Sequence, residues 1–145
     1  MRRILKWAAI CIILFSLYLV TNHFTYDFHY TKGEKDGQLV TSPNGAYSAQ
    51  VYYQNYGGAA GGVNTFVNVT FHLEDNVERT VYFSDAKSQV YVSWVEEDVL
   101  NIWNNDGFAD RSVALEVGKE IYDEHGGACG TYRVKKHFIC YSKNS

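Results

Sequence analysis

The chain has little proline, few charged residues and few cysteines, and each shortage excludes a class of protein. One proline in 145 residues, with 20% charged and 46% hydrophobic residues, excludes a proline-rich or highly charged disordered chain. Three cysteines are too few for a domain built on a disulfide framework. The length fits one domain, and the aromatic share of 16% provides material for a core.

Positive charge is also scarce beyond the first six residues. Arg2, Arg3 and Lys6 are three of thirteen basic residues, so the remaining ten Lys and Arg face sixteen Asp and Glu, a net charge of −6. Nucleic-acid-binding proteins need a basic face that neutralises phosphates. The composition therefore excludes a nucleic-acid partner.

The N-terminal hydrophobic run predicts a membrane anchor. Trp7 to Val20 carry no charge over fourteen positions and follow a basic stub. Extended to Ile4 or Phe24, the run approaches the roughly 20 residues that a spanning helix needs. It has neither a small-residue cleavage site nor a polar stripe, which favours an uncleaved signal-anchor over a signal peptide or a buried helix. The flanking charges predict a single-pass membrane protein with a cytoplasmic N-terminus and an extracytoplasmic C-terminal domain.

These boundaries divide the chain into four predicted parts. The expected parts are a cytoplasmic stub at residues 1–6, a transmembrane helix at 7–24, a juxtamembrane spacer at 25–37 and an extracytoplasmic β-rich domain at 38–145. The spacer mixes aromatic and charged residues with Gly33 and Gly37, as expected of an interfacial segment.

Beyond residue 38 the dominant hydrophobic period is two, which is typical of β-strands. The pattern predicts about seven short strands, near residues 38–41, 47–54, 65–73, 80–83, 90–94, 100–102 and 113–117. Ser42-Pro-Asn-Gly45 has the residue order of a type I turn. We expect a mainly β fold, an antiparallel sandwich, a barrel-like domain or a curled meander. Helical turns are expected only at residues 85–89 and 119–124.

Two tryptophans end neighbouring predicted strands. Trp94 lies in phase with the apolar face of its strand, whereas Trp103 lies out of phase with Leu100 and Ile102. The alternation therefore predicts a buried Trp94 and an exposed Trp103.

The three cysteines separate into one within the hydrophobic run and two near the C-terminus. Cys11 is expected to act as a small apolar residue. Cys129 and Cys140 fall in the predicted external domain, where a disulfide persists, so we predict that they are bonded to each other. Two unpaired thiols are the alternative.

The stretch Asn55-Tyr-Gly-Gly-Ala-Ala-Gly-Gly-Val-Asn64 is the best candidate for a functional surface, with four of the twelve glycines within six residues. It lacks the lysine and hydroxyl of a phosphate-binding loop and the glycine spacing of a dinucleotide fingerprint. Its glycines would let another surface approach the backbone beside aromatic and amide groups. We predict a binding site formed by Tyr53, Asn55, Tyr56, Gly57, Gly58, Gly61, Gly62 and Asn64. A wide hairpin loop without a ligand is the alternative.

The stretch His125-Gly-Gly-Ala-Cys-Gly130 is the main candidate for catalysis. It is similar to an oxyanion-hole loop and nearly forms a nucleophile elbow, but the elbow needs glycine where Thr131 stands. A Cys129 nucleophile would need His125 or His137 as its base and would have to stay reduced. We therefore predict no enzymatic activity and no cofactor, with a hydrolase that uses His125 and Cys129 as an alternative.

A metal site is not predicted either. Asn104 to Asp110 resembles a calcium loop, but the first and last ligand positions of an EF-hand fall on Ile102 and Val113. The five histidines show no zinc-ligand spacing. A looser calcium site at Asp106 and Asp110 is the alternative.

Several motifs together resemble a known family. They are the basic stub with one hydrophobic run, the glycine stretch, and the segments Ser42-Pro-Asn-Gly-Ala-Tyr-Ser-Ala49, Tyr82-Phe-Ser-Asp-Ala-Lys-Ser88 and Trp94-Val-Glu-Glu-Asp-Val-Leu100. The chain resembles a family of unknown function of small single-span, membrane-anchored extracytoplasmic proteins from Gram-positive, Bacillus-like bacteria. The resemblance implies a membrane location and a compact external β-rich domain, and it transfers no catalytic residue.

The sequence as a whole predicts a membrane-anchored extracytoplasmic binding or accessory module of the bacterial cell envelope. The expected partners are the membrane and an envelope protein, a peptide or a cell-wall ligand. Besides the hydrolase, the remaining alternative is a structural accessory protein that acts through its transmembrane helix.

Overall fold

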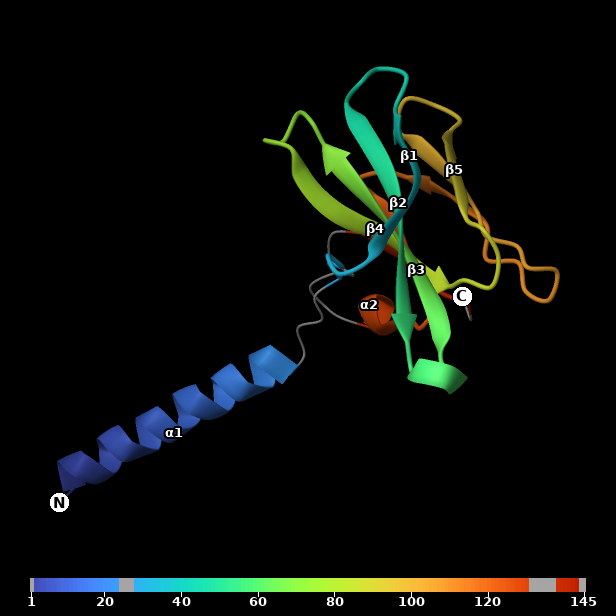
Figure 1. The fold of residues 1–145 in the computed structure, drawn as a ribbon. Helices are drawn as coiled ribbons and strands as arrows, with labels where there is room; N and C mark the ends of the chain where they lie inside the picture. Colours follow the sequence, from blue (N-terminus) through green and yellow to red (C-terminus); the bar gives the residue numbers. More distant parts are fainter. Residues whose placement is uncertain (1, 24–27, 131–137, 144–145) are drawn as a thin grey trace.

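A mainly β architecture is confirmed by the computed structural model, which describes residues 2–23, 28–130 and 138–143. Helix α1 (Arg2–His23) is followed by nine strands within these ranges, arranged in two sheets (Figure 1). The alternating pattern predicted about seven strands, and the additional ones lie near the C-terminus.

The larger sheet has the strand order β1-β2-β3-β4-β8-β9. Its strands are β1 (Glu34–Thr41), β2 (Tyr47–Tyr56), β3 (Gly62–Phe71), β4 (Val77–Asp85), β8 (Glu120–Asp123) and β9 (Ile139–Tyr141). Strands β1 to β4 pair antiparallel. The Ser42 turn joins β1 to β2, and the Gly45 amide donates to the Ser42 carbonyl at 2.9 Å.

Strand β8 corrects the prediction of a purely antiparallel domain, because it pairs in parallel with both β4 and β9. The same residues were expected to form a helical turn, which is wrong. Ile121, Tyr122 and Asp123 are all buried. A strand covered on both faces loses the period of two that marks a half-exposed strand.

The smaller sheet is an antiparallel meander of β5 (Tyr91–Trp94), β6 (Val99–Trp103) and β7 (Val113–Glu116). The helical turn expected before it, at residues 85–89, is absent from the structure. Instead, the Ala86 amide donates to the Val63 carbonyl and the Val90 amide donates to Tyr53 Oη, each at 2.8 Å. These bonds attach the connection between β4 and β5 to the larger sheet.

The core lies between the two sheets, and strand β5 lies beside β1 (Figure 1). The core contains mainly aliphatic and aromatic side chains, among them Val51, Val67, Val69, Phe71, Val81, Tyr82, Leu100, Ile102 and Leu115. Trp94 packs against this core, and its Nε1 donates to the Val40 carbonyl at 2.9 Å, which joins the two sheets. Trp103 is 52% exposed, as the phase of the pattern predicted.

The opposite face of the larger sheet contacts the segment before β1. The Tyr30 ring stacks on Phe83 with centroids 4.3 Å apart, and it lies 5.7 Å from Phe66. The Tyr30 amide donates to Thr80 Oγ1, and its carbonyl accepts from Asn68 Nδ2. Tyr30 therefore packs as part of the β domain, and β1 begins at Glu34, within the segment that the sequence assigned to a spacer.

Helix α1 contains the hydrophobic run that predicted the anchor. Among the residues that the structure describes, however, no helix combines the length and apolarity needed to cross a bilayer. The uncharged run Trp7–Val20 has fourteen residues, which at 1.5 Å per residue cover about 21 Å of a hydrocarbon core ~30 Å thick. The predictions of a transmembrane signal-anchor at residues 7–24 and of a single-pass membrane location are therefore wrong. The predicted cytoplasmic N-terminus and extracytoplasmic domain were derived from that anchor and lose their basis with it.

Candidate functional site

The glycine stretch forms the turn of the β2–β3 hairpin, closed by the pair Tyr56–Gly62. A short 3₁₀ helix, η1 (Gly58–Ala60), crosses its tip. Gly57 and Gly58 have φ angles of 79° and 60°, a left-handed conformation that favours glycine. A Cβ on Gly61 would lie 1.6 Å from the Tyr56 carbonyl oxygen. Three of the four glycines are therefore required by the path of the turn.

The Tyr56 side chain accounts for the fourth glycine. A Cβ on Gly62 would lie 2.6 Å from Tyr56 Oη and 2.8 Å from Cζ, so the ring packs directly over this glycine. Tyr56 is 48% exposed. Together with Asn55 and the glycines it lines a depression of about 340 Å³ at the tip of the hairpin.

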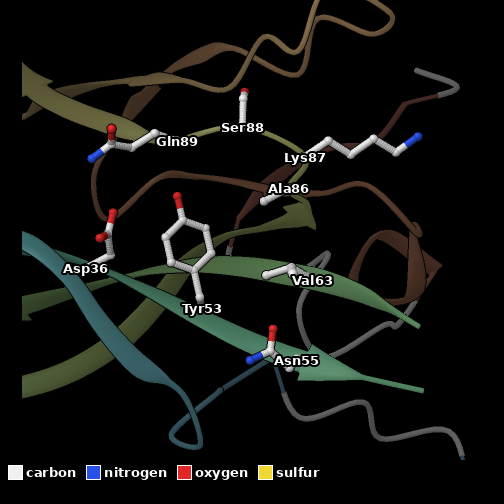
Figure 2. Close-up of a pocket in the computed structure, with 8 residues that line it drawn as sticks. All are labelled: Asp36, Tyr53, Asn55, Val63, Ala86, Lys87, Ser88 and Gln89. Carbon is white, nitrogen blue, oxygen red and sulfur yellow. The ribbon is translucent and has the colours of Figure 1, made fainter. Parts of the chain in front are cut away.

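A second and larger cleft of about 420 Å³ lies beside this depression (Figure 2). Four segments supply its walls: β1, β2, β3 and the connection between β4 and β5. The lining residues are Asp36, Tyr53, Asn55, Val63, Ala86, Lys87, Ser88 and Gln89. Asn55 and Val63 line both cavities, so the two form one continuous concave surface.

The alternation of β2 explains why this surface sits at the end of the core. Ala49 and Val51 point into the core, and Tyr53 and Asn55 follow them on the same face of the strand. The solvent exposure of the side chains increases along this face of β2, from a buried Val51 to an exposed Asn55. The same face that builds the core therefore continues outwards as the wall of the cleft.

The predicted site residues divide between these two cavities. Tyr53 and Asn55 line the cleft, and Asn55, Tyr56 and the four glycines line the depression. Asn64 lines neither, because it follows Val63 on β3 and points to the opposite face.

The sequence interpretation missed the other cleft residues. Asp36 fell in the predicted spacer, and Ala86 to Gln89 fell in a predicted helical turn. The segment containing Lys87 and Ser88 enters the sequence analysis only through the motif Tyr82–Ser88. No sequence signal placed it opposite Asp36.

Tyr53 stands at the centre of the cleft (Figure 2). Its Oη accepts a hydrogen bond from the Val90 amide at 2.8 Å. Burial raises the pKa of Tyr53, and the charge of Asp36 adds to this effect. The phenol is therefore protonated at neutral pH, and its O–H can donate to a ligand.

Several polar groups of the cleft are unpaired. Within the described ranges the Asp36 carboxylate, the Asn55 amide and the Lys87 ammonium have no hydrogen bond or ion pair. Gln89 Oε1 accepts from Tyr91 Oη at 2.7 Å, which leaves the Gln89 amide nitrogen available. The cleft thus offers both donors and acceptors to a ligand.

A second polar cluster is buried and fully engaged within the protein. Arg111 Nε donates to both carboxylate oxygens of Glu124, and an Arg111 guanidinium nitrogen lies 3.1 Å from Asp106 Oδ2. Burial would raise the pKa of Glu124, but hydrogen bonds from Ser84 and Arg111 outweigh it and hold the pKa at about 2. Glu124 is therefore ionised at neutral pH and does not serve as a general acid.

The residues of the calcium alternative bind donors of the protein itself. Asp106 Oδ1 accepts from the Phe108 and Ala109 amides, and Asp110 Oδ1 accepts from the Ser112 amide. In the part of the chain that is described, no group of three or more His, Cys, Asp or Glu side chains is positioned to hold a metal.

The candidate hydrolase residues do not assemble into a catalytic pair. Cys129 and Cys140 are joined in a disulfide, and a disulfide sulfur has no thiolate with which to attack a substrate. His125 is exposed, and its Nε2 lies 3.9 Å from Asp85 Oδ1. His137 and Thr131 lie outside the described residues.

Comparison with known proteins gives one result, a match to a family model. Neither the curated proteins nor the solved structures give a match. A family model described as a family of unknown function, DUF5412, matches residues 2–127, which include all of the cleft residues. Strand β9 and the disulfide lie beyond the matched span. Since the match extends over most of the chain, the protein belongs to the DUF5412 family of unknown function.

Proposed function

We propose that the protein is a non-enzymatic binding or accessory module of the bacterial cell envelope. Its ligand occupies the cleft between β1, β2 and residues 86–89. The observation that carries this proposal is the presence of unpaired polar groups on Asp36 and Asn55, together with the available amide nitrogen of Gln89, around one cavity. Polar groups that converge on a cavity without internal partners are typical of ligand sites.

Two features support a binding role over a catalytic one. The candidate nucleophile Cys129 is held in a disulfide, and the ionised Glu124 is held by Arg111. The Tyr53 phenol in the cleft stays protonated at neutral pH, since its pKa is raised by burial. The cleft groups thus provide hydrogen bonds and charge, which suit recognition.

The envelope assignment is supported by the disulfide and by the sequence motifs. Disulfides persist in oxidising surroundings and are rare in the cytosol. The resemblance of the Ser42–Ala49 and Trp94–Leu100 motifs to proteins of Gram-positive, Bacillus-like bacteria favours such a source. The acidic charge of the chain beyond its first six residues favours a partner other than nucleic acid.

Retention of an envelope component tests the proposal. The full-length chain is immobilised and exposed to an envelope fraction that contains walls and solubilised membranes. The cleft variants are Asp36→Asn and Asn55→Ala, and Tyr56→Ala tests the hairpin tip. We expect the double cleft variant to reduce retention by roughly tenfold or more, as for the loss of a charge-assisted hydrogen bond.

Asp75→Asn is the matched control. It makes the same carboxylate-to-amide change in the β3–β4 turn, at the end of β3 opposite the cleft. Asparagine also tolerates the positive φ of 54° at this position. Equal retention by the wild type, the control and the double cleft variant would refute the site.

A further inference from the structure

Two aromatic side chains are exposed beside the cleft, on the outer face of the smaller sheet. Tyr91 on β5 is 56% exposed, and its register partner Trp103 on β6 is 52% exposed. Within the described ranges neither ring contacts another aromatic ring, and the Trp103 indole N–H has no hydrogen-bond partner. Side chains opposite each other in a sheet lie about 5 Å apart. The two rings are therefore neighbours with accessible faces.

Gln89 connects this aromatic pair to the cleft. Its side chain lines the cleft, and its Oε1 accepts from Tyr91 Oη at 2.7 Å. Ser88 Oγ donates to the Asn105 carbonyl at 3.2 Å, which joins the same segment to the chain just after Trp103. The cleft and the aromatic pair thus form one continuous surface.

This surface carries little charge. The outward-facing neighbours of the pair on the sheet are Ser93, Asn101 and Ala114. Asp36 is the one carboxylate that lines the cleft, and the Lys87 side chain extends away from it (Figure 2). The net charge of −6 beyond the first six residues repels a polyanion. The charge distribution therefore disfavours an anionic ligand.

The unpaired polar groups on this surface need both hydrogen-bond donors and hydrogen-bond acceptors from a ligand. The Asp36 carboxylate only accepts hydrogen bonds, the Gln89 amide nitrogen and the Trp103 indole only donate, and the Asn55 amide does both. A proline-rich peptide, which also binds aromatic-lined grooves, lacks an N–H at each proline and therefore offers few donors to Asp36. Sugar hydroxyls donate and accept, and the C–H groups of a sugar ring pack on the electron-rich face of an aromatic ring.

We propose, resting on the binding function above, that the ligand is an uncharged, hydroxyl-rich glycan. One sugar lies in the cleft against Asp36, Asn55 and Gln89, and the neighbouring sugars pack on Tyr91 and Trp103. The cleft volume of about 420 Å³ lies within the range of small-ligand sites. A glycan chain satisfies the acceptors and donors of the cleft and covers the exposed rings together.

Calorimetric titration of the full-length chain tests the ligand class. The uncharged glycans are N-acetyl-chitotetraose and cellotetraose, and the comparison ligands are a proline-rich decapeptide and polyglutamate. We expect a glycan to bind and Trp103→Ala to weaken its affinity by roughly tenfold. Trp103→Phe should retain most of the affinity, because it keeps an aromatic face. Leu73→Ala is the control, since Leu73 is 87% exposed at the opposite end of β3.

Each outcome decides a separate point. Absence of glycan binding, or an affinity that Trp103→Ala and Tyr91→Ala leave unchanged while circular dichroism shows folded variants, refutes the glycan assignment. Binding of the decapeptide alone, lost in Asp36→Asn, refutes the glycan assignment but leaves the binding function standing. Equal retention of the envelope fraction by the double cleft variant refutes the cleft as the binding site, whatever the class of ligand.

Discussion

Arg111 and Glu124 form a buried ion pair in which Arg111 Nε donates to Oε1 at 2.9 Å and to Oε2 at 3.0 Å. Their side chains are only 5% and 4% exposed. Arg111 precedes β7 of the smaller sheet, whereas Glu124 follows β8 of the larger sheet. Ser84 Oγ at the end of β4 also donates to Glu124, at 2.7 Å. The pair therefore connects the two sheets at the parallel strand.

Removal of Arg111 is predicted to destabilise the protein strongly. Arg111→Ala leaves Asp106 without its cation, and it leaves the buried Glu124 with only the exposed Lys143, whose Nζ lies 3.3 Å from Oε1. An uncompensated buried charge costs about 3 kcal/mol or more. Urea unfolding followed by circular dichroism measures this loss in the free energy of unfolding.

Lys119→Ala is the control for that measurement. It breaks the pair between Lys119 and Glu116, in which the lysine side chain is 66% exposed. Exposed ion pairs contribute little, because water and salt screen them. If both variants lose equally little stability, the buried pair does not hold the sheets together.

Acid is predicted to destabilise the protein through Glu124. The folded pKa of Glu124, about 2, lies below the ordinary value of 4.5, so the folded state binds this proton more weakly than the unfolded state. The resulting stabilisation is complete above the ordinary pKa, and it is lost as the pH falls through the folded pKa. Backbone hydrogen bonds from Ala109 and Phe108 also lower the pKa of Asp106, which adds in the same direction.

The experiment compares urea midpoints of the wild type and Glu124→Gln between about pH 5 and pH 2. The wild type should lose more stability over this interval than the variant, whose amide has no proton to take up. Parallel curves for the two proteins would show that Glu124 is not the titrating group.

The thiol count is predicted to be one per native chain. Cys11 is the free cysteine and is exposed, whereas Cys129 and Cys140 are bonded to each other. A thiol reagent should therefore label one cysteine before reduction and all three cysteines after reduction and unfolding. Three reactive thiols in the native, oxidised protein would contradict the pairing.

Loss of the disulfide is predicted to lower the free energy of unfolding by about 3 kcal/mol, because the crosslink restricts the unfolded chain. The sequence separation of the two cysteines is 11 residues. The double variant Cys129→Ser with Cys140→Ser removes the bond, and Cys11→Ser serves as its control. Urea unfolding of both variants measures the difference.

Gly61→Ala is predicted to destabilise the β2–β3 hairpin by about 1–3 kcal/mol. Its Cβ would overlap the Tyr56 carbonyl oxygen at 1.6 Å, so the backbone of the turn must move. Gly130→Ala is the control, because a Cβ at that position has no neighbour within 4 Å. Equal free energies of unfolding for the two variants would show that the turn is not closed at Gly61.

Alternation along the sequence was sufficient to predict the strands of the hairpins. The row Tyr47, Ala49, Val51 and Tyr53 shares one face of β2, and alternation alone indicates that face. Strand β8 was missed, since its three consecutive buried residues show no alternation. The hydrophobic run predicted a helix correctly, but its length was overestimated by counting beyond the uncharged residues.

Only part of the candidate site could be predicted from the sequence. Tyr53 and Asn55 adjoin the glycine stretch, so a local search found them. Asp36 and Gln89 reach the same cleft from β1 and from the connection after β4. Asp36 and Gln89 come close to Tyr53 because of the strand order of the sheet and the hydrogen bond from the Val90 amide to Tyr53 Oη. No local sequence pattern predicts either of these long-range contacts.

The strand that carries Tyr53 and Asn55 also carries the core residues Ala49 and Val51. Occupancy of the cleft is consequently linked by mass action to global unfolding, because an unfolded chain does not present the cavity. Candidate ligands can thus be ranked without a label or an assay of activity, by the rise in melting temperature that each one produces.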